Sequence, residues 1–315
     1  SSRRRHTRFR NVTGVQTCAL PIFGAKIELH EGYVYAQTPR GLTGGEVEFP
    51  FVSVGATEHT LLAAVLAKGE TVVRNAACEP EIVDLADCLN KMGAKVTGAG
   101  TSTIQIQGVA RLGGATHEVL PDRIETGTYA LAAAMAGGKV RLTRTQSDFI
   151  QPVLDKMVEA GVEVTLHDDG LTITRDGGRL RPVEITTEPY PGFPTDLQAP
   201  FMALMTLADG ESTIRETIFE NRLMHVPELG RLGADITVQG GEARVRGVAA
   251  LEGAQVMATD LRASVSLVIA GLAARGETVV NRVYHLDRGF ERLEEKLGAC
   301  GAQVRRLKGD GGEVE

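Results

Sequence analysis

The sequence predicts an α/β protein that is built from repeated β-α-β-α-β-β units. An apolar helical run that ends at a glycine and leads into a short β-branched run occurs four times along the chain. A second, amphipathic helical run follows each of the four and again stops at a glycine before a pair of strands. Because a fixed period indicates a repeat architecture, this recurrence predicts the fold class. The glycines after the second helices, spaced 68, 72 and 68 residues apart, are Gly93, Gly161, Gly233 and Gly301.

The apolar helical run is the first helix of each repeat. The four segments that contain this run, its turn and the following strand are residues 53–73, 125–142, 195–214 and 259–280. Their turn glycines are Gly69, Gly138, Gly210 and Gly276. A helix end that hands over to a strand needs a residue with left-handed backbone, which glycine adopts at the least cost. We therefore expect left-handed backbone at all eight glycines.

The two helices of a repeat differ in polarity. The first is apolar nearly all round, as in LLAAVLA (61–67) and ALAAAMA (130–136), so we expect it to be buried on every side. The second carries charge on one face, as in DLADCLNKMG (84–93), so we expect it to have a solvent side. Sheets are then expected to enclose the first helices.

The first recognisable segment, residues 23–37, matches the closing third of a repeat. Gly24 lies 69 residues before Gly93, and two strand-like runs follow both glycines. A closing third alone leaves a sheet without partners and an apolar face uncovered, so we expect an N-terminal part to be absent. Residues 1–23 contain five arginines, no acid and no structural period, and are interpreted as a non-native leader.

The repeats are expected to group into two lobes, the first of them incomplete. Residues 24–121 are predicted to be the remnant of the first lobe. Residues 122–309 are predicted to form a second lobe of three repeats, which should lack a strand or two. The polar, glycine-rich residues 310–315 are expected to be a disordered tail.

Composition argues against several classes of protein. The longest apolar run, Ser264–Ala274, is shorter than the roughly 20 residues that span a bilayer, so no membrane insertion is predicted. The four cysteines lie far apart without a CxxC pair, which predicts neither a metal site nor disulfides and suits a reducing cytoplasm. Without the leader, 29 basic and 40 acidic residues give a net charge of −11, so no nucleic-acid surface is expected. An anionic ligand must therefore meet locally clustered cations.

Four longer motifs narrow the interpretation. They are PGFPTDLQAP (191–200), ETIFENRLMHVPEL (216–229), QVMATDLRAS (255–264) and YHLDRGFERLEEKL (284–297). With these motifs the chain resembles the enolpyruvyl transferases over about residues 24–309, and specifically those that use UDP-N-acetylglucosamine. The resemblance implies two lobes, each an inside-out α/β barrel of three β-α-β-α-β-β units, with the catalytic lobe incomplete here.

The resemblance also implies a reaction. The enolpyruvyl group of phosphoenolpyruvate would be transferred to the 3-hydroxyl of UDP-N-acetylglucosamine with release of phosphate and without a cofactor or metal. This is the first committed step of peptidoglycan synthesis, which implies a cytoplasmic enzyme of cell wall biogenesis, cell shape, cell cycle and cell division. The alternatives are a 3-phosphoshikimate 1-carboxyvinyltransferase and a non-catalytic paralogue. The oligomeric state stays open.

Four residues are candidates for the chemistry. By resemblance, Asp196 accepts the proton of the sugar hydroxyl, while Arg222, Arg262 and Arg288 surround the phosphate and carboxylate of phosphoenolpyruvate, Arg288 as a catalytic residue. Arginine suits this task because its planar fork binds such anions with two hydrogen bonds.

Each of these candidates also has a structural alternative. Asp196 follows a proline and precedes an apolar helix, a pattern typical of helix capping. Arg262 has Asp260 as a neighbouring partner, and Arg288 precedes acids on the next helix with which it could form salt bridges of little energy.

Contacts to the nucleotide sugar are implied for Val52, Ser53, Val54 and Ile218. Val52 and Ile218 could equally be ordinary core residues of strands. Some members of the family have a lysine where this chain has Phe51, which puts one contact to the diphosphate in doubt.

Other polar residues are given structural roles. We expect interdomain salt bridges from Arg123, Glu125, Glu79 and Glu81, and core or loop positions for His225 and His285. Cys18 lies in the leader and is not a candidate nucleophile. The family's N-terminal lysine, its loop cysteine and the arginines beside that loop have no counterpart in this sequence, so the chain by itself is expected not to be catalytically competent.

Overall fold

The computed structural model describes residues 22–30 and 33–307 and has the predicted mixed α/β character. The chain divides into two compact units at Leu120 and Pro121, and each unit is described by itself. Cys18 and the predicted C-terminal tail lie outside the described residues. None of the described helices combines the length and the apolar character needed to cross a bilayer.

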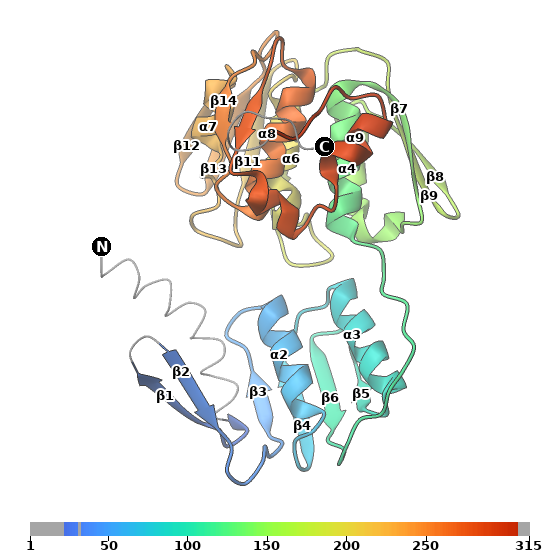
Figure 1. The fold of residues 1–315 in the computed structure, drawn as a ribbon, viewed down its shortest axis with the longest axis vertical. Helices are drawn as coiled ribbons and strands as arrows, with labels where there is room; N and C mark the ends of the chain where they lie inside the picture. The colour runs from blue at the N-terminus through green and yellow to red at the C-terminus, as the bar shows by residue number, and fades with distance from the viewer. Residues whose placement is uncertain (1–21, 31–32, 308–315) are drawn as a thin grey trace. The chain divides into compact units, whose positions relative to one another are not determined.

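The first unit contains a hairpin and one full repeat (Figure 1). The hairpin pairs β1 (Lys26–His30) with β2 (Tyr33–Gln37) in antiparallel orientation. The repeat follows in the predicted order as β3 (Glu46–Glu48), α2 (Val54–Ala64), β4 (Glu70–Arg74), α3 (Pro80–Lys91), β5 (Lys95–Thr97) and β6 (Thr103–Gln107). Its sheet has the strand order β3-β4-β6-β5, with β3 and β4 parallel.

The core of the first unit corrects two expectations from the sequence. Phe23, which we placed at the end of the leader, is fully buried and packs in this core. Helix α2 is not buried on every side, because Leu62 is 52% exposed. Among the described elements of this unit, α2 packs against α3 and the strands β4 and β6, which leave Leu62 half exposed.

The second unit has three sets of elements, of which the middle one is a full repeat among the described residues. The first set is α4 (Arg123–Ala136), β7 (Gly138–Thr143), η1 (Ser147–Ile150), α5 (Gln151–Glu159), β8 (Glu163–His167) and β9 (Gly170–Arg175). The second is β10 (Glu184–Thr186), η2 (Thr195–Leu197), α6 (Gln198–Met205), β11 (Glu211–Arg215), α7 (Val226–Arg231), β12 (Asp235–Gln239) and β13 (Glu242–Arg246). The third is β14 (Gln255–Met257), α8 (Leu261–Ala273), β15 (Val279–Asn281), η3 (Val283–Arg288) and α9 (Leu293–Ala299).

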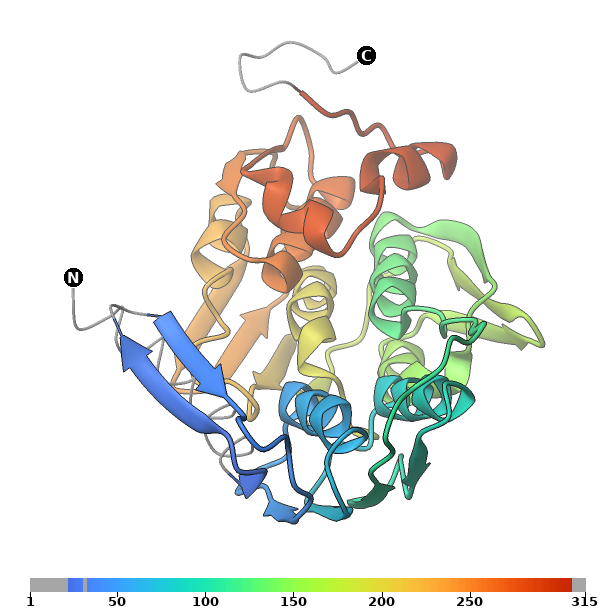
Figure 2. The same cartoon turned by 60° about the horizontal axis from the view of Figure 1, so that its bottom comes forward.

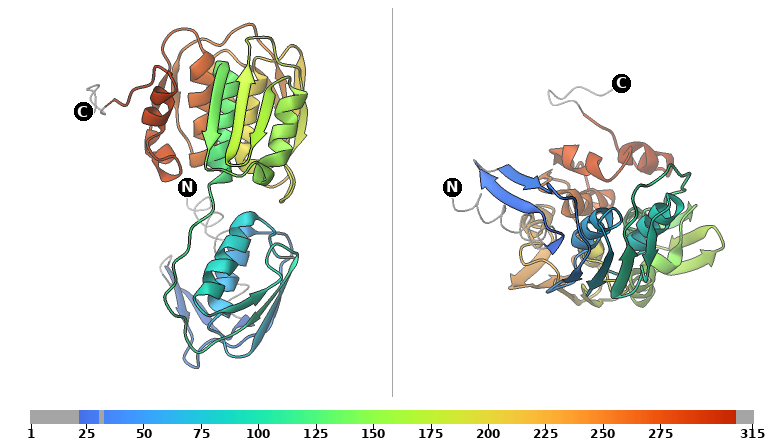
Figure 3. Two further views of the ribbon diagram at one scale, coloured as in Figure 1. Left: turned by 90° about the vertical axis from the view of Figure 1, so that its right-hand side faces the viewer. Right: turned by 90° about the horizontal axis from the view of Figure 1, so that it is seen from below.

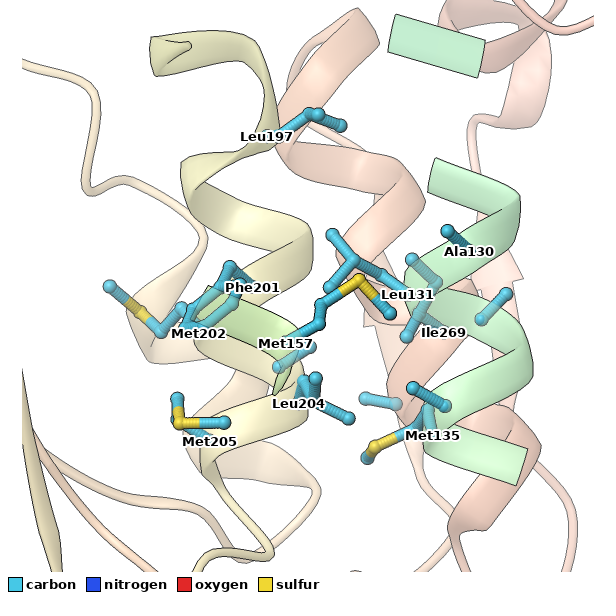
Figure 4. Packing of buried hydrophobic residues seen from close by; sticks show 14 of the residues in the cluster. Ala130, Leu131, Met135, Met157, Leu197, Phe201, Met202, Leu204, Met205 and Ile269 are labelled. Atoms are coloured by element: carbon cyan, nitrogen blue, oxygen red, sulfur yellow. The ribbon is translucent and has the colours of Figure 1, made fainter. Parts of the chain in front are cut away.

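The inner helices α4, α6 and α8 contact one another, and the sheets lie outside them (Figures 2 and 3). All eight residues of α6 are buried, as the sequence predicts for an inner helix. Leu131 of α4, Phe201 of α6 and Ile269 of α8 lie between the helices, with Met157 of α5 beside them (Figure 4). The prediction that sheets enclose the first helices is therefore confirmed for this unit.

The glycine prediction is confirmed, but the strand expected directly after Gly301 is not found among the described residues. All eight predicted glycines, and Gly24 as well, have positive φ. After α9 no strand forms up to Leu307, the last described residue, although we expected one after Gly301. Within 302–307 only Leu307 takes part in a β-bridge, and a single bridge does not make a strand.

One of the predicted interdomain salt bridges is instead internal to the second unit. Lys296 Nζ lies 2.6 Å from Glu125 Oε1, which joins α9 to the start of α4. The sequence could not indicate this pair because 171 residues separate its members. The histidine prediction agrees with the structure, since His225 is buried and His285 stacks on Tyr284 in η3.

Candidate functional site

Three of the predicted site residues come together in the second unit. Asp196 lies in η2 at the entry to α6, Arg262 lies in the first turn of α8, and Arg222 lies in the loop between β11 and α7. The Asp196 carboxylate accepts a hydrogen bond from Arg222 Nη2 through Oδ1, and its Oδ2 lies 3.2 Å from Arg262 Nε. All three side chains are partly buried, which strengthens charge interactions relative to the open surface.

Asp196 does not cap a helix, so the capping alternative is wrong. Neither η2 nor α6 has a side-chain cap, and the carboxylate faces two guanidinium groups instead of backbone N–H groups. Asp260, at the equivalent place in the next repeat, does cap: its Oδ1 accepts from the backbone N–H groups of Arg262 at 2.9 Å and Ala263 at 2.7 Å. Asp260 therefore fixes the backbone that carries Arg262, whose side chain pairs with Asp196.

Aromatic rings hold both guanidinium groups from a second side. Arg222 Cζ lies 4.9 Å from the centroid of Phe219, and Arg262 Cζ lies 5.9 Å from the centroid of Phe290. Such contacts restrict the orientation of the guanidinium plane. Nη1 of Arg262 is buried and makes no hydrogen bond within the described chain. The hydrogen-bonding capacity of this nitrogen is therefore not used within the described chain.

Arg288 lies on the segment that packs against the start of α8. It ends η3, and a Cβ on the next residue, Gly289, would approach Leu261 Cδ1 to 2.8 Å. Arg288 is exposed and has no ion pair with any residue that the structure describes. The expected salt bridge to the next helix is made by Arg306 instead, which pairs with Asp287 and, at 3.0 Å, with Glu294.

The arrangement is suited to an anion that reacts beside a carboxylate. The cluster formed by Asp196, Arg222 and Arg262 has one more positive than negative charge, and the N-terminus of α8 adds to the positive potential. Arg288 supplies a further cation on the adjacent segment. Among residues 22–30 and 33–307 we find no group of histidine, cysteine or acidic residues that could hold a metal ion.

Comparison with known proteins identifies the family. Residues 16–297 match the family model of EPSP synthase (3-phosphoshikimate 1-carboxyvinyltransferase). The chain is 73% identical over 293 residues to the UDP-N-acetylglucosamine 1-carboxyvinyltransferase of Caulobacter vibrioides, covering 93% of this chain and 68% of that protein. This chain belongs to the enolpyruvyl transferase family. The protein of the same name from Methylobacterium radiotolerans is 64% identical over 290 residues, with 92% and 68% covered.

Solved structures of enolpyruvyl transferases share this fold. The enolpyruvyl transferase NikO from Streptomyces tendae superposes with a TM-score of 0.82 at 29% identity, covering 92% of this chain and 72% of that chain. An EPSP synthase from Acinetobacter baumannii gives a TM-score of 0.69 at 20% identity, covering 91% and 70%, and supports the fold alone.

The residues predicted to contact the nucleotide sugar in this enolpyruvyl transferase are divided between the two units. Ser53 is the N-cap of α2, with its hydroxyl accepting from Ala56 N at 3.3 Å. Val52 and Val54 are half-buried and pack against the core of the first unit. Ile218 lies in the second unit, in the loop that also carries Arg222. The sequence prediction for these four contacts remains a prediction.

His225 is buried behind the arginine cluster. It is 1% exposed, and neither ring nitrogen makes a hydrogen bond of ordinary geometry in the described chain. Burial lowers the pKa of His225 to about 4, although the Asp260 carboxylate and the Arg222 backbone act in the opposite direction. The ring is therefore neutral at physiological pH, which argues for a packing role and against proton transfer to substrate.

This buried histidine predicts how stability depends on pH. Its pKa falls from 6.5 when unfolded to about 4 when folded, so between these values the unfolded state binds more protons. Stability is fully present above pH 6.5 and is lost as pH falls toward 4, by about 2 kcal/mol between pH 7 and pH 5. We expect urea unfolding to show this loss and His225→Gln to abolish it, whereas His285→Gln should leave it unchanged.

Glu216 was not among the predicted site residues, although it lies between them. Its carboxylate accepts hydrogen bonds from the backbone of Ile218 and from Thr195, the neighbour of Asp196. A glutamate directly after a strand has no distinctive pattern, and Thr195 is 21 residues away. Only the contact between the two loops reveals this residue.

Proposed function

We propose that this enolpyruvyl transferase chain acts in the transfer of the enolpyruvyl group from phosphoenolpyruvate to the 3-hydroxyl of UDP-N-acetylglucosamine, with release of phosphate. The observation that carries the proposal is the carboxylate of Asp196 between the guanidinium groups of Arg222 and Arg262. The names of the relatives that are 73% and 64% identical support the choice of sugar acceptor. On this basis the chain would belong to cytoplasmic peptidoglycan synthesis and so to cell shape and division.

Each residue of the cluster would have a separate task. Arg222, Arg262 and Arg288 would hold the phosphate and carboxylate of phosphoenolpyruvate, and the buried Nη1 of Arg262 is a donor ready for one of these oxygens. As the anion binds, the arginines would break their ion pairs with the Asp196 carboxylate and pair with the substrate. Asp196 would then accept the proton of the 3-hydroxyl while the sugar oxygen bonds to C2 of phosphoenolpyruvate. A proton adds at C3 in the same addition. When phosphate then leaves C2, a proton is lost from C3 and the double bond between C2 and C3 forms again.

Ligand binding distinguishes this proposal from its alternatives. Calorimetric titration of the chain with UDP-N-acetylglucosamine should show binding, and titration with shikimate 3-phosphate should show none. The reverse result would favour a 3-phosphoshikimate 1-carboxyvinyltransferase, the enzyme for which the matching family model is named. Phosphate release from phosphoenolpyruvate, followed in parallel, would demonstrate turnover by this chain and so contradict the non-catalytic paralogue. Binding of neither acceptor contradicts the proposal.

Replacing Asp196 by asparagine tests its role as the proton acceptor. Wherever the unsubstituted chain releases phosphate, Asp196→Asn should lower the rate by about 10²- to 10⁴-fold, because an amide cannot accept the hydroxyl proton. The affinity for UDP-N-acetylglucosamine should stay within about threefold, since the amide keeps the size of the side chain. Retained turnover would show that another group accepts the proton.

A further inference from the structure

Glu216 is a buried carboxylate that the reaction described above does not use. It follows β11 and is 7% exposed, and its backbone N–H donates to Gly241 O at 2.8 Å. A carboxylate in such a place is costly unless hydrogen bonds replace its lost water. The hydrogen-bond donors around the Glu216 carboxylate therefore show which segments it holds in place.

Four donors surround this carboxylate. Oε1 accepts from the backbone N–H groups of Ile218 at 2.8 Å and Phe219 at 3.0 Å, and from the hydroxyl of Thr187 at 3.0 Å. Oε2 accepts from the hydroxyl of Thr195 at 2.8 Å. One side chain thus fixes the loop that carries Ile218 and Phe219 and also reaches the segment that carries Asp196.

The direction of these hydrogen bonds extends the network to the arginine cluster. The Thr195 hydroxyl has a single proton, which it donates to Glu216, so it can only accept from Arg222 Nη1 at 3.0 Å. Arg222 donates its other terminal nitrogen, Nη2, to Asp196. Glu216, Thr195, Arg222 and Asp196 therefore form a continuous chain of hydrogen bonds, in which Arg222 donates toward both ends.

We propose that Glu216 is a positioning residue for the reaction: it orients Arg222 through Thr195 and couples the loop of Ile218 to the cluster of Asp196. The loop carries both Ile218 and Arg222, whereas Asp196 lies in η2, so their relative position depends on contacts between the two segments. A shift of about 1 Å in a reacting group is costly. The inference rests on the proposed function for its substrates, but the orientation of Arg222 can be observed without any ligand.

The Glu216→Gln variant interrupts this hydrogen-bond network while keeping the size and shape of the side chain. If the amide oxygen continues to serve Ile218 and Phe219, the amide nitrogen faces the Thr195 hydroxyl. Thr195 then loses its acceptor and has two donors, the new amide and Arg222, directed at its oxygen. Arg222 should lose its fixed orientation even though its own side chain is unchanged.

Two further variants separate positioning from plain structural support. Thr195→Val cuts the connection to Arg222, whereas Thr187→Val removes a fully buried partner of Glu216 that does not contact Arg222. Glu242→Gln is the matched control, because Glu242 lies on the neighbouring strand β13 and its carboxylate bonds only to Arg215 and Arg244 among the described residues.

The experiment combines nitrogen NMR of the Arg222 guanidinium with calorimetric titration of phosphoenolpyruvate in the presence of UDP-N-acetylglucosamine. The slowly rotating Nη signals of Arg222 should disappear in Glu216→Gln and Thr195→Val and persist in Thr187→Val and Glu242→Gln. The affinity for phosphoenolpyruvate should fall about 10- to 100-fold in the first two variants, and the double variant should lose no more than either alone.

The outcomes distinguish the two hypotheses. Persistence of the Arg222 signals in Glu216→Gln overturns the positioning role, whatever the ligands do. Loss of phosphoenolpyruvate affinity in Thr187→Val equal to that in Glu216→Gln also overturns it, because support of the loop would then suffice. If the unsubstituted chain binds neither ligand, the proposed function fails, while the NMR signals still decide whether Glu216 orients Arg222.

Discussion

Reversing the charge of Arg262 is expected to weaken the binding of phosphoenolpyruvate by about 100-fold or more. Arg262→Glu removes the free donor at Nη1 and brings a second carboxylate toward Asp196, whose Oδ2 lies 3.2 Å from Arg262 Nε. A hydrogen bond to a charged group contributes about 1.5–3 kcal/mol, and repulsion of the substrate anion adds to its loss. Affinity for UDP-N-acetylglucosamine should change by less than about threefold, which calorimetric titration of both ligands can check.

Arg275→Glu is the matched control for this charge reversal. Arg275 lies just past the other end of α8, about 20 Å along the helix from Arg262, and its side chain is 73% exposed. The Arg275→Glu substitution changes the net charge by the same amount as Arg262→Glu, so a general electrostatic effect would appear in both variants. Equal weakening of phosphoenolpyruvate and nucleotide sugar by Arg262→Glu would indicate that Arg262 packs the site and does not select the anion.

Adding a single methyl group at Gly247 is expected to destabilise the second unit by at least about 3 kcal/mol. A Cβ at this position would lie 1.7 Å from the carbonyl oxygen of Ala208 and 2.7 Å from its carbon. These are backbone atoms in the turn after α6, so they cannot rotate away as a side chain would. Gly108 makes the same approach to Ala67 in the first unit, at 1.6 Å, so the close contact recurs with the repeat.

Urea unfolding of Gly247→Ala measures this loss, with Gly230→Ala as the control. Gly230 lies in helix α7, has no atom within 4 Å of a built Cβ and is exposed. Alanine there should be neutral or stabilise the protein by up to about 1 kcal/mol, because alanine favours helix. Equal unfolding midpoints for the two variants would show that Gly247, directly after β13, does not lie this close to Ala208.

The repeat architecture was predictable because it depends on local physics that recurs. Positive φ at glycines such as Gly93 and Gly233 follows from the helix-to-strand turn itself. Burial of α6 follows from an apolar sequence on all sides. Helix α2 has a similar sequence but keeps Leu62 half exposed, because burial also depends on how many neighbours the surrounding unit provides.

The candidate site was only partly predictable. Asp196, Arg222 and Arg262 were chosen by resemblance to a family, and the structure places them in contact. Their supporting residues carried no signal, since Glu216 acts through Thr187 and Thr195, which are distant in sequence. Long-range hydrogen bonds of this kind depend on the packing of whole repeats, which no local pattern encodes.

The sequence by itself determined the repeat, its helices and strands, and the family, because these depend on periodicity and on long motifs. The tertiary structure decided what identical residues do. The sequence Thr-Asp-Leu occurs twice, at residues 195–197 and at residues 259–261. Asp260 has extended backbone at an N-cap and binds the helix N–H groups, whereas Asp196 lies inside a 3₁₀ turn and turns its carboxylate to two arginines. The difference comes from how the chain enters each helix and from which loop packs beside it.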